Sequence, residues 1–246
     1  MRISKKFFAG FLAGAVALSG ATTARADEDK WPAVSGQLAT ITLSVDAAGS
    51  QTVDSYDFST QQWHKVTFTW NPETKELHVS AESSAATLPY DEFTELVAKF
   101  KANSADASII FDNAMMLPEG SGGLFWGWQG QIIGTEKLNT SKVTNMDSMF
   151  DGVTNANPNV ANWDTSKVTS MIRMFADATK ANPDVTNWDV RNVNRNNNAG
   201  FLDMFKGATS ATPSPAWANT AIAKGTAVDS TSAVAGSLSS AFPFSS

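Results

Sequence analysis

LNTSKVTNMDSMFDGVTNANPNVAN, residues 138–162, is followed at once by a second copy of itself, WDTSKVTSMIRMFADATKANPDVTN, residues 163–187. Of the 25 aligned positions, 14 are identical. A third copy begins with WDVRNV at residues 188–193 and resumes with FLDMFKGATSATP at residues 201–213. Self-similarity at a fixed period of about 20–50 residues is typical of repeat proteins, so the repeats decide the fold.

Each copy has a helix-like half and an extended half. Residues 146–153 place Met, Met, Phe and Val at the i, i+3, i+4, i+7 spacing of one helix face. Pro158 and Pro183 prevent that helix from continuing, and the Trp-Asp-Thr-Ser-Lys-Val segment suits a short strand. One strand and one short helix per copy predict an α/β fold. The expected architecture is a short parallel-strand leucine-rich-repeat-like solenoid of about three coils.

The period changes at both ends of the repeats. Residues 118–128, PEGSGGLFWGW, carry a Leu-Phe pair 25 residues before the Met-Phe of the next copy, which indicates a degenerate first coil. Trp126 and Trp128 are then expected to cover the open end of the stack. No Lys-Ser/Thr follows the glycines, so this run is not a phosphate-binding loop. Five extra residues within 194–200 mark the third copy as a terminal repeat.

The recurring apolar residues are predicted to be the interior of the repeats, with methionine filling gaps rather than binding metal. The Trp163 and Trp188 column has an alternative interpretation as an exposed platform for sugar rings. We favour burial, because Leu138 occupies the equivalent earlier position and a platform would not survive that exchange. The predicted repeat core is Val143, Met146, Met149, Phe150, Trp163, Val168, Met171, Met174, Phe175, Trp188, Val193, Met204 and Phe205.

We expect four regions along the chain. Residues 1–26 are a signal peptide, 27–117 a β-rich cap region, 118–217 the repeat solenoid and 218–246 a flexible Ala/Ser/Thr tail. In the cap region, residue alternation and the turn sequence Asn-Pro-Glu-Thr-Lys predict a β-hairpin, and a helical apolar stripe follows it. The expected elements are strands at 39–45, 62–70, 76–80 and 108–111 and a helix at 91–102.

The first 26 residues have a basic start, an apolar stretch at 7–21 and an Ala-Arg-Ala cleavage site at 24–26. This pattern predicts secretion or display at the cell surface, with cleavage after Ala26. The apolar stretch is too short and too rich in Gly and Ala for a good membrane span, and we see no transmembrane segment after it, so we expect no stable membrane insertion after cleavage.

The net charge and the cysteine and histidine content argue against nucleic-acid binding, catalysis and metal binding. Cleavage removes four basic residues and no acidic one, which takes the net charge from −6 to −10 and disfavours nucleic-acid binding. Cysteine is absent, and His64 and His78 are the two histidines. Neither lies in a recognisable catalytic pattern, so we expect no enzyme activity, no metal site and no cofactor. The candidate binding face is formed by Lys142, Lys167, Trp126 and Trp128.

Residues 163–175 and 181–189 resemble the repeat of about 25–26 residues found in BspA-like leucine-rich-repeat bacterial surface proteins, the former DUF285 group. The resemblance covers residues 62–217. It implies a secreted or surface-attached protein without enzyme activity that acts in adhesion. No binding residue carries over, because the shared motif is the interior of each coil.

Three hypotheses follow. The first is an extracellular, monomeric, non-catalytic protein that mediates binding or adhesion to a protein or glycan partner. The second is a carbohydrate-binding module that uses Trp126, Trp128 or the hairpin aromatics. The third is a truncated remnant of a surface protein without a selected function.

Overall fold

The computed structural model describes residues 41–57, 60–103, 106–193 and 200–212. The chain divides into two compact units, Met1–Gln37 and Leu38–Ser246, and every described residue belongs to the second. The predicted signal peptide, the predicted tail and all of the 194–200 insertion except Gly200 lie outside the described residues.

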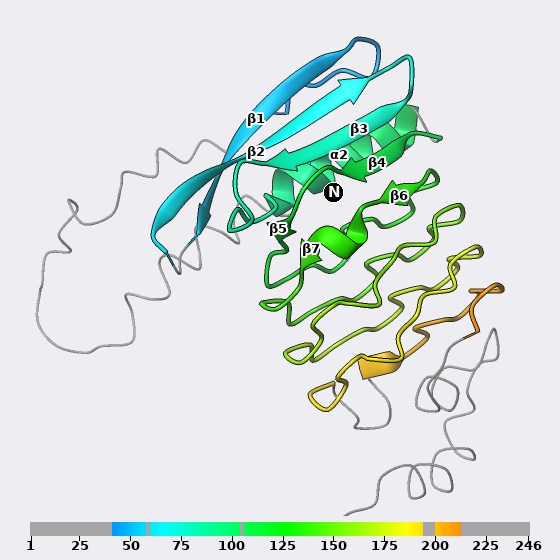
Figure 1. Cartoon of the computed structure of the whole chain (residues 1–246). Helices are drawn as coiled ribbons and strands as arrows, with labels where there is room; N and C mark the ends of the chain where they lie inside the picture. Colours follow the sequence, from blue (N-terminus) through cyan, green and yellow to red (C-terminus); the bar gives the residue numbers. More distant parts are fainter. Residues whose placement is uncertain (1–40, 58–59, 104–105, 194–199, 213–246) are drawn as a thin grey trace, which may run out of the picture. The chain divides into compact units, whose positions relative to one another are not determined.

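The N-terminal part of the second unit is a mixed five-stranded sheet (Figure 1). The strand order is β1-β2-β3-β4-β6, with the first two pairings antiparallel and the last two parallel. The predicted hairpin and the predicted strand at 108–111 are confirmed. The strands are β1 (Gly49–Asp57), β2 (Gln62–Asn71), β3 (Glu76–Ala81), β4 (Ser108–Phe111) and β6 (Ile132–Ile133).

The strand predicted at 39–45 is wrong for its described part, because residues 41–45 form no strand. Ile41 and Leu43 are nevertheless buried, with 6% and 5% of their surface exposed. The alternation therefore marked which side chains face the core, and the first described strand begins later, at Gly49.

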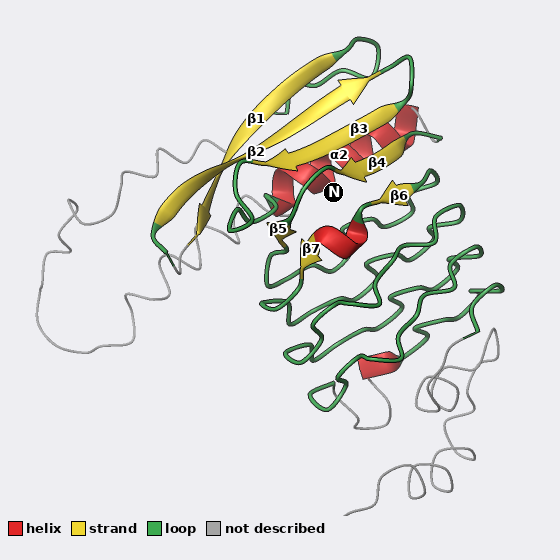
Figure 2. Ribbon diagram, viewed as in Figure 1, coloured by secondary structure: helices red, strands yellow, loops and turns green. Residues whose placement is uncertain are grey.

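Helix α2 (Tyr90–Asn103) covers the inner face of this sheet and confirms the helix predicted at 91–102 (Figure 2). Acidic residues lie in its first turn and Lys101 in its last, which suits the helix dipole. Its buried stripe includes Phe93 and Phe100. The Phe100 ring lies 4.5 Å from that of Trp70, and Phe93 contacts Phe68 at 6.3 Å between ring centroids.

The predicted parallel-strand leucine-rich-repeat-like solenoid is wrong. Most paired strand residues belong to the antiparallel pairings of the five-stranded sheet. The second sheet is small and joins β5 (Met115–Met116) to β7 (Leu138–Asn139), after the 3₁₀ turn η1 (Thr135–Lys137). Beyond β7, the described residues of the repeats contain neither a regular strand nor an α-helix, and the short red piece in the last repeat is a 3₁₀ turn at residues 200–201 (Figure 2).

Left-handed residues explain why the Met/Phe half of each copy is not a helix. In each copy the residues two before and two after the central Phe have a positive φ, and such a residue turns the chain out of the helical path. The pairs are Gly123 and Gly127, Ser148 and Gly152, Arg173 and Asp177, and Asp203 and Gly207.

The backbone hydrogen bonds of these turns alternate between two directions. Met149 N–H donates to Met146 C=O within its own turn at 3.3 Å, whereas Phe150 N–H donates to Met174 C=O in the next copy at 2.8 Å. The same inter-copy bond joins Phe125 to Met149 at 3.0 Å. Beyond β7, successive copies therefore stack through their backbones without regular strands. Residues 118–193 and 200–212 are called the repeat stack below.

Aromatic rings form the centre of the repeat stack. Phe125, Phe150, Phe175 and Phe205 lie one above another, with ring centroids 5.0, 5.2 and 5.4 Å apart and planes within 8° of parallel. The column continues into the sheet region, because Phe125 packs edge-on against Phe93 of α2 at 5.6 Å. One hydrophobic core thus joins the sheet, the helix and the repeats.

Candidate functional site

The left-handed turns form one side of the repeat stack, called here the turn edge: residues 122–127, 147–152, 172–177 and 202–207. The three ring spacings of the Phe column make this edge about 15 Å wide. Trp126 in the first turn and Leu202 in the last are each 58% exposed. Large apolar side chains are therefore displayed in the outermost turns of the same edge.

Trp126 is held in place by a lysine from helix α2. The Lys101 ammonium lies 4.3 Å from the centre of the indole ring, and it donates a hydrogen bond to the Trp126 carbonyl at 3.1 Å. The next residue, Gly127, has a φ of 67°, and a Cβ there would lie 3.0 Å from the lysine nitrogen. An exposed indole fixed in this way loses little side-chain freedom on binding.

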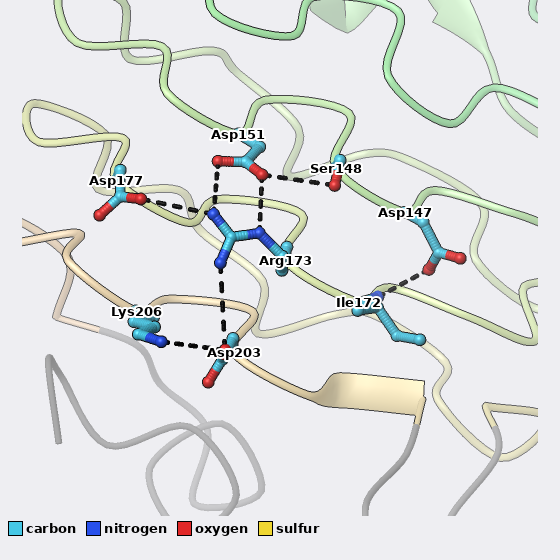
Figure 3. Close-up of polar contacts among 8 residues, drawn as sticks. All are labelled: Asp147, Ser148, Asp151, Ile172, Arg173, Asp177, Asp203 and Lys206. Atoms are coloured by element: carbon cyan, nitrogen blue, oxygen red, sulfur yellow. Dashed lines mark hydrogen bonds and ion pairs between the residues drawn. The ribbon is translucent and has the colours of Figure 1, made fainter. Parts of the chain in front are cut away.

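Arg173 lies at the centre of the turn edge and joins three turns (Figure 3). It donates to both carboxylate oxygens of Asp151, at 2.8 and 3.1 Å. Its guanidinium also lies 3.4 Å from Asp177 and 4.0 Å from Asp203. The hydrogen bonds to Asp151 and the neighbouring carboxylates raise the pKa of Arg173. The guanidinium is thus occupied by the protein's own acids, which makes this cluster a clamp between turns.

Further contacts in Figure 3 complete the clamp, among them a hydrogen bond of 3.4 Å from the Ser148 hydroxyl to the Asp151 carboxylate. The Asp147 carboxylate accepts the Ile172 N–H of the next turn at 2.7 Å. Lys206 lies 3.3 Å from Asp203 and balances its charge. The polar middle of the turn edge is therefore largely paired within the protein.

The Trp-Asp-Thr-Ser motif also has a structural role. The Asp164 carboxylate accepts the Ser166 N–H at 3.0 Å, and hydrogen bonds from Ser166 lower the pKa of Asp164. The Thr165 hydroxyl donates to the Asp189 carbonyl of the following copy at 3.0 Å. The motif closes a turn and connects it by a hydrogen bond to the next copy. This structural role explains why the motif recurs, and no ligand is needed to explain it.

The structure buries all the residues predicted as the repeat core, each with at most 5% of its surface exposed. Trp163 and Trp188 lie parallel, with centroids 6.5 Å apart. Their indole N–H groups donate to backbone carbonyls at 2.9 and 3.0 Å. Both rings are therefore interior groups rather than sites for sugar stacking.

The four residues of the predicted binding face are not brought together. Trp126 and Lys167 are exposed. Trp128 is 1% exposed and donates its indole N–H to the Gln131 carbonyl at 3.3 Å. Lys142 reaches back to the sheet, where its ammonium lies 3.3 Å from the buried carboxylate of Asp57. Of this set, Trp126 alone lies on the turn edge.

The two histidines lie on the sheet. His78 Nδ1 lies 2.7 Å from an Asp112 carboxylate oxygen, and His64 Nδ1 lies 3.9 Å from Glu82. Within the described ranges, no group of three or more His, Cys, Asp or Glu side chains could hold a metal ion. A search of the same residues found no helix that is long and apolar enough to cross a membrane.

A comparison with family models gives one match. Residues 124–236 match the model described as Mycoplasma protein of unknown function, DUF285. The match covers slightly less than half of the chain and begins in the first turn of the turn edge. Comparisons with curated proteins and with solved structures gave no match. The chain is therefore similar to the DUF285 family over its repeats, in line with a surface repeat protein.

Sequence reasoning missed two features of the surface. The sequence does contain a signal for the left-handed turns: glycine, which readily adopts a positive φ, stands two residues after the central Phe in three of the four copies, at 127, 152 and 207. The sequence contains no signal for the Arg173 clamp, because the arginine does not recur: the equivalent residue in the preceding copy is Ser148.

Proposed function

We propose that this chain is a secreted or cell-surface bacterial protein, related to the BspA-like surface proteins, that binds a protein partner through its turn edge without catalysis. The observation that carries the proposal is the display of Trp126, an exposed indole held rigid by Lys101. The predicted signal peptide and the DUF285 match support a surface location.

The chemistry of the turn edge favours a protein partner. Tryptophan is enriched among the few residues that supply most of the binding energy in protein interfaces. Leu202, equally exposed, offers a second apolar contact in the last turn of the same edge. The paired charges around Arg173 lie in the turns between them, where a polar surface with satisfied hydrogen bonds is tolerated at an interface.

The proposal is tested with the chain lacking residues 1–26, immobilised and exposed to purified extracellular-matrix proteins and mucin. Trp126→Ala is the test variant, and Ile133→Ala is the matched control, because Ile133 is 49% exposed but lies on β6, outside the turn edge. We expect a protein from the panel to bind. Trp126→Ala should weaken that binding by about 2 kcal/mol, or roughly 30-fold, and the control should leave it within about twofold.

Two outcomes contradict the proposal. One is the absence of binding to every protein of the panel above the level of a scrambled-sequence control. The other is binding that Trp126→Ala leaves unchanged. Fractionation of the producing cells into supernatant, wall, membrane and cytoplasm tests the location separately, and a product confined to the cytoplasm would contradict secretion.

A further inference from the structure

The outer face of β1 and β2 carries four successive cross-strand pairs. Residues 53, 55 and 57 of β1 point inward and are buried, so the residues between them face outward. The same holds for β2, where the even-numbered residues from His64 to Trp70 are buried. In strand register, the four outward pairs are Ser50 with Thr69, Thr52 with Thr67, Asp54 with Lys65, and Tyr56 with Trp63. These eight residues are called the outer strip.

An aromatic pair ends the outer strip. The Tyr56 and Trp63 rings lie 4.9 Å apart between centroids with an interplanar angle of 54°. Trp63 is 45% exposed, which is unusual for so large an apolar side chain on a strand. The neighbouring pair is ionic: Lys65 Nζ lies 3.3 Å from Asp54, with 60% and 62% of the two side chains exposed.

Hydroxyl groups fill the rest of the outer strip. The Thr52 and Thr67 hydroxyls lie 2.9 Å apart, and those of Ser50 and Thr69 lie 2.8 Å apart. Each hydroxyl pair uses one donor between its members and keeps a further donor and further lone pairs for a ligand. Side chains on one face of a strand repeat every two residues, so the strip extends over about 20 Å.

We propose that the outer strip binds a neutral glycan chain. The apolar C–H face of one sugar ring packs against the Trp63 indole at the end of the strip. The following sugars place their hydroxyls against the Lys65–Asp54 pair and then against the Thr52–Thr67 pair. The Lys65 ammonium donates to sugar oxygens, and the Asp54 carboxylate accepts from sugar hydroxyls.

Charge favours a neutral polymer over a charged one. The single acid and single base of the outer strip are paired, so the strip has no net charge. The chain as a whole carries −6, which repels polyanions such as glycosaminoglycans. Thr side chains are ordinary on the solvated face of a strand, but a tryptophan that is 45% exposed leaves a large apolar surface in water. One aromatic pair among six polar residues also offers too little apolar surface for the centre of a protein interface.

This site is separate from the turn edge, since the two share no residue, and each can fail without the other. The test uses the chain lacking residues 1–26 and isothermal titration with hexasaccharides of glucose, xylose, mannose and N-acetylglucosamine. Heparin serves as the polyanionic probe. The matching disaccharides test whether binding requires a chain long enough to extend along the outer strip. Ile133→Ala serves as the control variant, because Ile133 is 49% exposed on β6 and belongs to neither the outer strip nor the turn edge.

We expect at least one neutral hexasaccharide to bind, its disaccharide to bind at least about tenfold more weakly, and heparin not to bind. Trp63→Ala should weaken binding of the hexasaccharide by at least about tenfold, Trp63→Phe by less, and Ile133→Ala by less than about twofold. The three substitutions lie at exposed side chains and should leave the thermal unfolding midpoint within about 2 °C, so a loss of binding is not a loss of fold.

Three results overturn the inference. They are the absence of binding by every neutral hexasaccharide at millimolar concentration, a preference for heparin, or binding that Trp63→Ala does not change. None of them bears on the protein partner of the turn edge, which is tested through Trp126.

Discussion

Replacing Phe150 by Ala removes the middle of the aromatic column. Phe150 has no exposed surface and stacks on Phe125 at 5.0 Å and on Phe175 at 5.2 Å. Core Phe→Ala substitutions cost about 3–5 kcal/mol, and each of the two lost stacks adds about 0.5–1.5 kcal/mol to ordinary burial. We therefore expect a loss near the top of that range, about 4–5 kcal/mol in the free energy of unfolding.

Urea unfolding followed by tryptophan fluorescence measures this loss, with buried Trp163 as a reporter 5.9 Å from the Phe150 ring. Leu202→Ala is the control; because Leu202 is 58% exposed, it should change stability by less than about 0.5 kcal/mol. Phe150→Leu keeps most of the apolar volume and should lie between the two, which preserves the test if the alanine variant does not fold. A loss below about 1.5 kcal/mol for Phe150→Ala would refute the stacked column.

Three further predictions concern other parts of the fold. Gly152→Ala places a Cβ on a residue with φ 71° and should cost about 1–2 kcal/mol in urea unfolding, whereas Gly120→Ala, where nothing lies within 4 Å, should cost less than half as much. Lys142→Met removes the ammonium from the buried carboxylate of Asp57 and should cost about 2 kcal/mol. Adding Asp57→Asn should restore part of that loss, and strictly additive losses would show that the two groups are not coupled. Burial raises the pKa of Glu92 above its ordinary value, so its contribution to stability is greatest at low pH and falls as pH rises through the raised pKa. Glu92→Gln should therefore unfold at higher urea than the wild type at pH 7; the difference should shrink as pH falls through the raised pKa and stay constant below the ordinary value of 4.5. A difference independent of pH would contradict this.

The cap region could be predicted because its signals are local. The alternation of Val66, Phe68 and Trp70 marks a half-buried strand, and the Asn-Pro turn that follows fixes the hairpin. The helix follows from the spacing of Phe93 to Phe100 and from the charges at its ends. The pairing of β3 with β4 joins distant segments in parallel, which no local pattern reveals.

The repeats were misjudged because helix spacing and turn spacing coincide. The i, i+3, i+4 placement of Met146, Met149 and Phe150 buries the same side chains whether the backbone is helical or folded into successive turns. What decides between them is a pair of positive φ angles, at Ser148 and Gly152. The glycine is a sequence signal for one member of the pair, but the serine gives no such signal for the other. The core residues follow from periodicity, but the backbone that holds them does not.

The candidate site residues could likewise be predicted only in part, because sequence patterns do not show which side chains are buried or paired in the fold. Trp126 was identified because it breaks the repeat pattern, whereas Trp128 two residues later is buried although its sequence context is the same. The Asp57–Lys142 pair joins residues 85 apart in the chain, so sequence alone could not remove Lys142 from a binding face.

Each copy stacks on the next through alternate backbone hydrogen bonds rather than forming a helix. Scalar couplings across hydrogen bonds, measured by NMR on deuterated protein, test this stacking directly at the Phe150 amide. The structure predicts a correlation between the Phe150 nitrogen and the Met174 carbonyl carbon, across the 2.8 Å bond to the next copy. A correlation with the carbonyl of Met146 instead, four residues earlier, would show a helix and contradict the stacked turns.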